Sequence, residues 1–245
     1  MGCGQSTIQG EAVIAVMGMT GSGKSSFIQR VSKKQTAAVG HGLQSDTSAV
    51  SLHTVHRGNG RVHLVDTPGF DNSRLSDVEV LKLLAFWLSM AYSAGIRIGG
   101  IIYMQRITDL RMSGTSLRSL EAFKQLCGPD AFPGITFLTT GWDIPVISRD
   151  GHARAAAQQR QAELENTPRC VGDILAGGGA AMALLPGREA ALALVDAIIR
   201  RRHNLVLRIQ VEMTVGSAAL GETGAGRTLR EAHRRDMARA AELDA

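Results

Sequence analysis

The sequence predicts a three-layer α/β domain, with a mostly parallel sheet, helices on both faces and one antiparallel edge strand. Strand-like and helix-like apolar runs alternate along the 245 residues, which is typical of parallel strands joined by crossover helices. A glycine-rich stretch at 18–25 lies between the first strand-like run and the first helix-like run. A turn signal, Arg57-Gly58-Asn59-Gly60, joins two more strand-like runs into a hairpin beside the first strand.

The spacing of apolar residues supports the elements one by one. In the segment 77–93 they recur at intervals of three and four, and Ser76 or Asp77 can cap the resulting helix. The polar, glycine-containing segment 33–48 indicates an exposed loop. The predicted strands are 12–17, 49–56, 62–65, 98–104, 135–138 and, more weakly, 181–185. The predicted helices are 25–31, 77–93, 116–126, 149–165 and a long final helix at 189–213.

The chain length is that of one large domain, or of one domain with tails. We expect a flexible N-terminus at 1–10, the α/β domain at 11–215, and a polar tail or extra helix at 216–245. The net charge of +5 is mild, and no basic stripe is interleaved with aromatic residues, so no nucleic-acid partner is expected. Three widely spaced cysteines indicate neither a disulfide framework nor a zinc site, and favour a reducing, cytoplasmic compartment.

The glycine-rich stretch fits the phosphate-loop pattern G-x-x-x-x-G-K-[ST]. Glycines allow backbone conformations that turn several N–H groups toward one anion, and the following helix adds its positive end. The lysine can reach the β- and γ-phosphates, and the serine hydroxyl can ligate Mg²⁺. The predicted nucleotide-binding residues here are Gly18, Met19, Thr20, Gly21, Ser22, Gly23, Lys24, Ser25 and Ser26.

A second phosphate-reading element follows the strand 62–65. Asp66-Thr67-Pro68-Gly69 matches D-x-x-G, in which the aspartate holds Mg²⁺ through water and the glycine N–H senses the γ-phosphate. We therefore assign Ser25 and Asp66 to the metal, and Lys24 and Gly69 to catalysis.

A threonine that reaches the metal is expected between these two elements. Thr47, just before the second strand, is the chosen residue for both metal binding and catalysis. Thr36 and Ser45 are rivals, and an ordinary solvated loop threonine is the alternative to a functional role.

A third element, Thr140-Gly141-Trp142-Asp143, follows the strand 135–138. Asp143 stands where the guanine-reading aspartate of N-K-x-D occurs, and Thr140, Trp142 and Asp143 are predicted to bind the nucleotide. The lysine that normally packs along the base is missing. Trp142 could supply a flat apolar surface instead, or could simply be a packed surface aromatic.

Together these motifs resemble fungal P-loop GTPase-domain proteins, which are related to the immune-associated (avirulence-induced) GTPases, the chloroplast import-receptor GTPases and the septins. The segment 100–112 and the segments 126–128 and 222–226 are also similar to that group. The resemblance implies GTP as ligand and substrate, Mg²⁺ as cofactor, slow hydrolysis, and nucleotide-dependent self-association as a homodimer through the nucleotide face.

One departure bears on turnover. Phe70 follows D-T-P-G, where a water-orienting glutamine would be expected. Arg106 and Arg111 could stabilise phosphate, even across a dimer, or could pair with Asp109 or other loop carboxylates. His41 could orient water or be a solvated loop histidine. Two other functions therefore stay open, a GTP-binding scaffold that does not hydrolyse and an ATP-dependent P-loop enzyme.

The N-terminus fits M-G-x-x-x-[ST], the pattern for N-myristoylation of Gly2. A palmitoyl group on Cys3 would supply the second lipid that stable anchoring needs. Membrane attachment on the cytoplasmic side is therefore predicted, against the alternative of an unmodified flexible start. The C-terminal arginines could favour an anionic surface, but interspersed acidic residues favour a solvated helix face.

Overall fold

The computed structural model describes residues 11–32, 49–57, 60–109, 114–201 and 203–243, with side chains described up to residue 238. Within this part of the chain, six strands form one sheet in the order β2-β3-β1-β4-β5-β6. Only the β2–β3 pair is antiparallel, which confirms the predicted fold class. The strands are β1 Ala12–Gly18, β2 Ser51–Arg57, β3 Gly60–Asp66, β4 Gly100–Arg106, β5 Ile135–Thr140 and β6 Ala180–Ala183.

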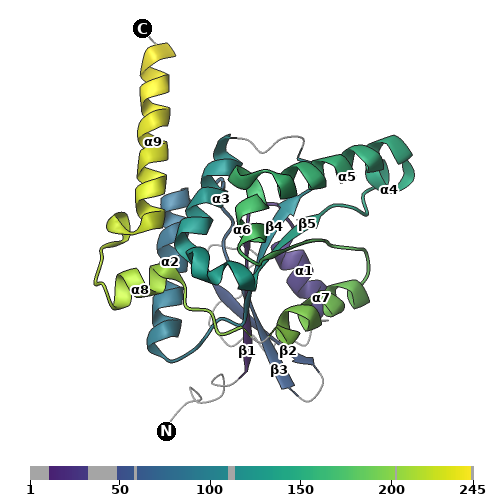
Figure 1. Ribbon diagram of the computed structural model, residues 1–245, viewed down its shortest axis with the longest axis horizontal. Coiled ribbons are helices and arrows are strands. Elements are labelled where there is room, and N and C mark those ends of the chain that lie inside the picture. Colours follow the sequence, from purple (N-terminus) through teal and green to yellow (C-terminus); the bar gives the residue numbers. More distant parts are fainter. Residues whose placement is uncertain (1–10, 33–48, 58–59, 110–113, 202, 244–245) are drawn as a thin grey trace.

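Helices cover both faces of this sheet (Figure 1). The α-helices are α1 Lys24–Ser32, α2 Asp77–Ser93, α3 Gly114–Cys127, α4 Pro145–Arg149, α5 Gly151–Asn166, α6 Asp173–Ala176, α7 Arg188–Arg200, α8 Arg208–Thr214 and α9 Gly224–Leu243. Three short irregular helical turns lie between them, at η1 Pro129–Gly134, η2 Pro168–Gly172 and η3 Leu220–Glu222.

The central strand β1 divides the core between the two faces. Its alternate residues point to opposite sides, as expected for a strand. Val13, Ala15 and Met17 join the cluster beneath α2, α3, α8 and α9. Ile14 and Val16 join the cluster beneath α1 and α7. Because both faces are buried, β1 reads as an unbroken apolar run that ends at the phosphate loop.

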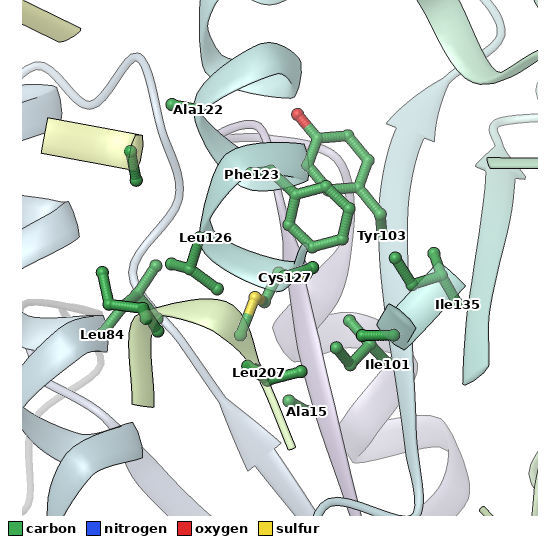
Figure 2. Close-up of a cluster of buried hydrophobic side chains, with 14 of the residues drawn as sticks. Ala15, Leu84, Ile101, Tyr103, Ala122, Phe123, Leu126, Cys127, Ile135 and Leu207 are labelled. Atoms are coloured by element: carbon green, nitrogen blue, oxygen red, sulfur yellow. The ribbon is translucent and has the colours of Figure 1, made fainter. Parts of the chain in front are cut away.

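The larger cluster packs aliphatic and aromatic side chains against α3 (Figure 2). The Tyr103 ring lies with its centroid 4.5 Å from that of Phe123 and 6.0 Å from that of Phe137. Cys127 is buried in the same cluster, and burial raises the pKa of its thiol. This packing holds β4 and β5, whose carboxyl ends carry site residues, firmly against α3.

The predicted helix at 189–213 is wrong in one respect, because it is two helices, α7 and α8. Between them the chain passes from the α1 face of the sheet to the α2 face. The Leu205 N–H donates to the Ile98 carbonyl at 2.8 Å, and Leu205 and Leu207 are buried. Burying these two leucines in the larger core cluster, beside the start of β4, outweighs continuing the helix.

Helix ends follow local chemistry elsewhere. Ser76 caps α2 and forms a reciprocal capping box with Glu79, which confirms one of the two expected caps. The helix predicted at 149–165 corresponds to the end of α4 and to α5, which are separated at Asp150. The Asp150 carboxylate accepts from the His152 and Ala153 N–H groups and so starts the second helix.

Among the described side chains of the C-terminal helix α9, the buried ones lie in its first half. Ala225 and Leu229 enter the larger core cluster, and Arg118 of α3 donates to Asp236 at 3.2 Å. Beyond this contact α9 extends away from the body of the molecule (Figure 1). Among the described residues, no helix combines the length and the apolar character needed to cross a membrane.

Candidate functional site

The phosphate loop joins β1 to α1 through three glycines with positive φ angles. These angles are +135° at Gly18, +76° at Gly21 and +92° at Gly23, which L side chains rarely adopt. Gly18 is also sterically closed, because a Cβ there would lie 2.2 Å from the Met104 carbonyl oxygen. The tight approach of β4 and the left-handed turns together explain why these positions are glycine.

Lys24 folds back over this loop. Its Nζ donates to the carbonyls of Gly18 at 3.2 Å and Met19 at 2.9 Å, and the residue is 6% exposed. Burial lowers the pKa of Lys24 to about 8, although nearby Asp66 acts in the opposite direction. An ammonium that has lost most of its hydration and lies at the start of a helix is well suited to a polyphosphate anion.

Ser25 and Asp66 form the adjacent polar pair. The Ser25 hydroxyl donates to Asp66 Oδ2 at 2.7 Å. Asp66 is 4% exposed, and burial raises the pKa of its carboxyl against the opposing effects of Ser25 and Lys24. Its Oδ1 atom is buried without a hydrogen-bond partner among the described residues. A hydroxyl beside a carboxylate with one unsatisfied oxygen is a donor set that fits Mg²⁺.

The D-T-P-G segment lies directly on the phosphate loop. The Thr20 N–H donates to the Phe70 carbonyl at 2.8 Å, and the Phe70 N–H donates to the Gly18 carbonyl at 3.3 Å. A Cβ at Gly69 would lie 2.7 Å from both Lys24 Nζ and the Thr20 nitrogen. Only glycine fits here, and its backbone is in contact with the residues expected to hold the γ-phosphate.

Phe70 does not take the place of a water-orienting side chain. Its ring is fully buried in the larger core cluster with Met19 and Val65. The residue therefore anchors the D-T-P-G segment in the core. This burial is a tertiary feature that the D-T-P-G-F pattern does not reveal.

A cavity of about 180 Å³ opens beside the phosphate loop. Six of the predicted nucleotide-binding residues line it, namely Gly21, Ser22, Gly23, Ser26, Thr140 and Asp143. Thr140 joins the two motifs physically, because its hydroxyl donates to the Ser22 carbonyl at 2.8 Å. The phosphate loop and the T-G-W-D element, more than a hundred residues apart in sequence, thus share one cavity.

Trp142 has a different surrounding. Its indole N–H donates to the Thr139 hydroxyl at 3.0 Å, and its ring packs beside Ile107 and Ile147. It lines a neighbouring groove of about 750 Å³, which shares Asp143 with the cavity. The ring is a packed aromatic in this structure, and its contact with a nucleotide stays a prediction.

Two arginines line the cavity. Arg106 lies 4.0 Å from Asp109, and its guanidinium is 3.5 Å from where a Gly21 Cβ would be. The structure is therefore compatible with both predictions for Arg106, that it stabilises phosphate and that it pairs with Asp109. The sequence motifs do not single out Arg30, which lies on α1, 4.0 Å from Asp143. Its position one turn after Ser26 on the same helix is the signal that could have identified it.

The loop after β6 supplies one more wall residue. The Leu184 N–H donates to the Thr139 carbonyl at 2.8 Å, and this residue lines the cavity. Several predicted residues lie outside the described part of the chain. These are Gly2, Cys3, Thr36, His41, Ser45, Thr47 and Arg111.

Comparisons with known proteins agree on the fold. Residues 13–113, which are less than half of the chain, match the family model of the 50S ribosome-binding GTPases. No curated protein sequence matches the chain.

Among solved structures, Toc33 from Arabidopsis thaliana with Mg²⁺ and GMPPNP is similar at a TM-score of 0.61 and 16% identity, covering 80% of this chain and 88% of that one. Toc33 with GDP and Mg²⁺ is similar at a TM-score of 0.59 with the same identity and coverage. A structure of the chloroplast translocon components atToc33 and psToc159 is similar at 0.60 and 16% identity, covering 80% and 84%.

At these identities the solved structures establish the fold alone. The chain has the fold of a P-loop GTPase domain. Its resemblance to the fungal group in particular stays a prediction.

Proposed function

We propose that this protein binds GTP with Mg²⁺, hydrolyses it slowly, and acts as a nucleotide-dependent switch. One observation carries the proposal. Asp143, the residue suited to read guanine, lines the same cavity as Gly21, Ser22 and Gly23 of the phosphate loop. A carboxylate can accept from guanine N1–H and the 2-amino group, whereas adenine offers an acceptor at N1.

Each residue has a definite task in this proposal. The loop N–H groups and Lys24 hold the phosphates, and Ser25 and Asp66 would hold Mg²⁺, with Thr47 as the expected third protein ligand. When bound, Mg²⁺ neutralises charge on the phosphate oxygens. A γ-phosphate held by Lys24 enters the space against Gly69, so its arrival or loss moves the D-T-P-G segment.

A binding comparison tests the nucleotide. Calorimetric titration with a non-hydrolysable GTP analogue and Mg²⁺ should give micromolar or tighter binding, with none for the ATP counterpart. Lys24→Ala should abolish binding, because it removes a cation bonded to the bound phosphates. Absence of GTP binding by the wild type would overturn the proposal, and equal binding of ATP would favour an ATP-dependent P-loop enzyme.

A non-hydrolysing GTP-binding scaffold is the second candidate, and the burial of Phe70 favours it. Phe70 directly follows Gly69, and its buried apolar ring cannot orient an attacking water. Phosphate release followed over hours with purified protein separates the two functions. Release above the Lys24→Ala background supports the slow enzyme, and none supports the scaffold.

Two partners accompany the proposal. For the chloroplast translocon components atToc33 and psToc159, dimerization is important for the GTPase activity. By analogy we propose a homodimer through the nucleotide face, where the Arg106 side chain is 52% exposed. We also propose a cytoplasmic location, from which lipidation at Gly2 and Cys3 would bring the protein to a membrane surface. Sedimentation with each nucleotide and mass spectrometry of the N-terminus test these two proposals.

A further inference from the structure

We infer that Arg30 is a specificity-determining residue that works with Asp143 at the base end of the cavity, in the role of the lysine missing from T-G-W-D. The inference rests on the proposed guanine-nucleotide function and deepens it. It assigns the recognition of the base to a side chain from helix α1, far in sequence from the base-reading motif.

The first support is the lysine position of the motif itself. Gly141 stands there with a φ of +84°, and nothing lies closer than 3.7 Å to where its Cβ would be. The next residue, Trp142, is held in the neighbouring groove by its bond to Thr139. In this structure neither residue supplies the long aliphatic side chain that the lysine would lay along a base.

The second support is the geometry of α1. This helix begins at Lys24 on the phosphate loop, and Arg30 lies six residues, or about 9 Å, further along its axis. Phe27 and Arg30 are one turn apart, and both line the cavity. The Arg30 guanidinium lies 4.0 Å from Asp143 Oδ2, and the two side chains are 32% and 48% exposed. One helix therefore serves the phosphates at its start and faces the base aspartate further along.

The third support is the division of labour between the two cavity arginines. Arg106 stands against Gly21 of the phosphate loop and has its own carboxylate partner in Asp109. Arg30 stands against Asp143, and no other carboxylate within the described ranges forms an ion pair with it. Arg106 thus marks the phosphate end of the cavity and Arg30 the base end.

The chemistry of the pair suits guanine. A planar, delocalised guanidinium stacks on flat rings more readily than an ammonium does. Its charge also attracts the carboxylate of Asp143, which lies 4.0 Å away. Both carboxylate oxygens then accept from guanine N1–H and the 2-amino group. Arg30 positions Asp143 and covers the purine, while the phosphate contacts are left to the loop.

The test compares three ligands. GDP carries guanine and a diphosphate, ADP carries adenine in place of guanine, and pyrophosphate has no nucleoside. Binding of GDP, ADP and inorganic pyrophosphate, each with Mg²⁺, is measured for wild type, Arg30→Ala, Arg30→Lys and Gln29→Ala. Gln29 is exposed on the same helix and is the matched control. We expect Arg30→Ala to weaken GDP binding about tenfold, Arg30→Lys to weaken it less, and both to leave pyrophosphate binding unchanged. Gln29→Ala should change nothing.

The outcomes distinguish a failure of the role inferred for Arg30 from a failure of the proposed guanine-nucleotide function. If the wild type binds pyrophosphate but does not prefer GDP over ADP, the proposed guanine-nucleotide function is overturned. A wild type with that preference, retained in Arg30→Ala, would overturn only the role of Arg30. Equal losses of GDP and pyrophosphate binding in Arg30→Ala would show a structural effect on α1, and would also overturn it. In an Asp143→Asn background, removal of Arg30 should have a smaller effect on GDP, because the positioned carboxylate is absent.

Discussion

The two ends of the proposed nucleotide cavity are built differently. At the phosphate end, Lys24 is 6% exposed and Asp66 is 4% exposed, and Gly18 is closed in by the backbone of β4. At the base end, the Asp143 side chain is 48% exposed. The nearby helix α5 has Ala157 as its only buried residue. The phosphate end is continuous with the hydrophobic core, whereas the base end lies on a thinly packed margin.

This difference indicates that such a fold can keep its phosphate-binding chemistry while the base that it recognises changes. Phosphate binding depends on backbone N–H groups, whose directions are set by the sheet and by α1. Substitutions in the phosphate loop should therefore weaken both folding and phosphate binding. Base recognition depends on a few partly exposed side chains, so changes there should alter selectivity and leave stability almost intact. The following predictions test this contrast, from the largest expected effect to the smallest.

Substitution of Gly18 by alanine should have the largest effect. The new Cβ would meet the Met104 carbonyl oxygen at 2.2 Å and would also strain a φ of +135°. We expect a loss of about 3 kcal/mol or more in the free energy of unfolding, measured by denaturant titration.

Gly23→Ala is the matched control for this substitution. Gly23 also has a positive φ, but no atom lies within 4 Å of its added Cβ. It should cost only about 1–2 kcal/mol of backbone strain. Equal losses at the two positions would contradict a phosphate loop wedged against β4.

The pH dependence of Lys24 should be the next largest effect. Phosphate binding favours the charged amine of Lys24, whose pKa in the nucleotide-free protein is about 8. GDP affinity should therefore change little from pH 7 to 8 and then fall by up to about tenfold per pH unit. Titrations with GDP between pH 7 and 9 measure this.

The same lysine should have the opposite effect on stability. Its pKa in the folded state is lowered from 10.5 to about 8, so the unfolded chain binds more protons between these values. The contribution of Lys24 to the free energy of unfolding therefore rises with pH across this window, relative to Lys24→Met. A fall of that difference above pH 8 would contradict the buried position of the amine.

Thr140→Val tests the hydrogen bond that joins the T-G-W-D element to the phosphate loop. It removes the donor to the Ser22 carbonyl and leaves a buried acceptor unpaired. We expect a loss of about 1 kcal/mol in unfolding free energy and a weakening of GDP binding of roughly fivefold. Thr140→Ser keeps the hydroxyl and should restore both. If the valine variant is unchanged in both assays, the two ends are not coupled through this bond.

The smallest effect is expected on the base-end helix. Gln158 of α5 is exposed and lines the groove beside Asp143. Gln158→Ala should change the free energy of unfolding by less than about 0.5 kcal/mol, and GDP affinity by less than about twofold. A thermal-unfolding comparison checks this. A loss above about 1 kcal/mol would mean that α5 is as integral to the fold as the phosphate loop.

The sequence by itself determined the features that depend on neighbouring residues. The phosphate loop follows from eight consecutive positions, because the glycine conformations and the helix start act locally. The alternation of strands and helices predicts the sheet, and the D-T-P-G and T-G-W-D elements follow their strands in the expected order. These are short-range patterns, and they predicted six of the residues that line the candidate cavity.

Only the tertiary structure decided the features that depend on packing between distant segments. The break between α7 and α8 comes from burying Leu205 against Ile98, and Phe70 is buried because the core beneath α2 has room for its ring. The pairing of Arg30 with Asp143 likewise joins residues more than a hundred positions apart. Each depends on which surfaces meet after folding, and burial there outweighs the local preferences that a sequence pattern records.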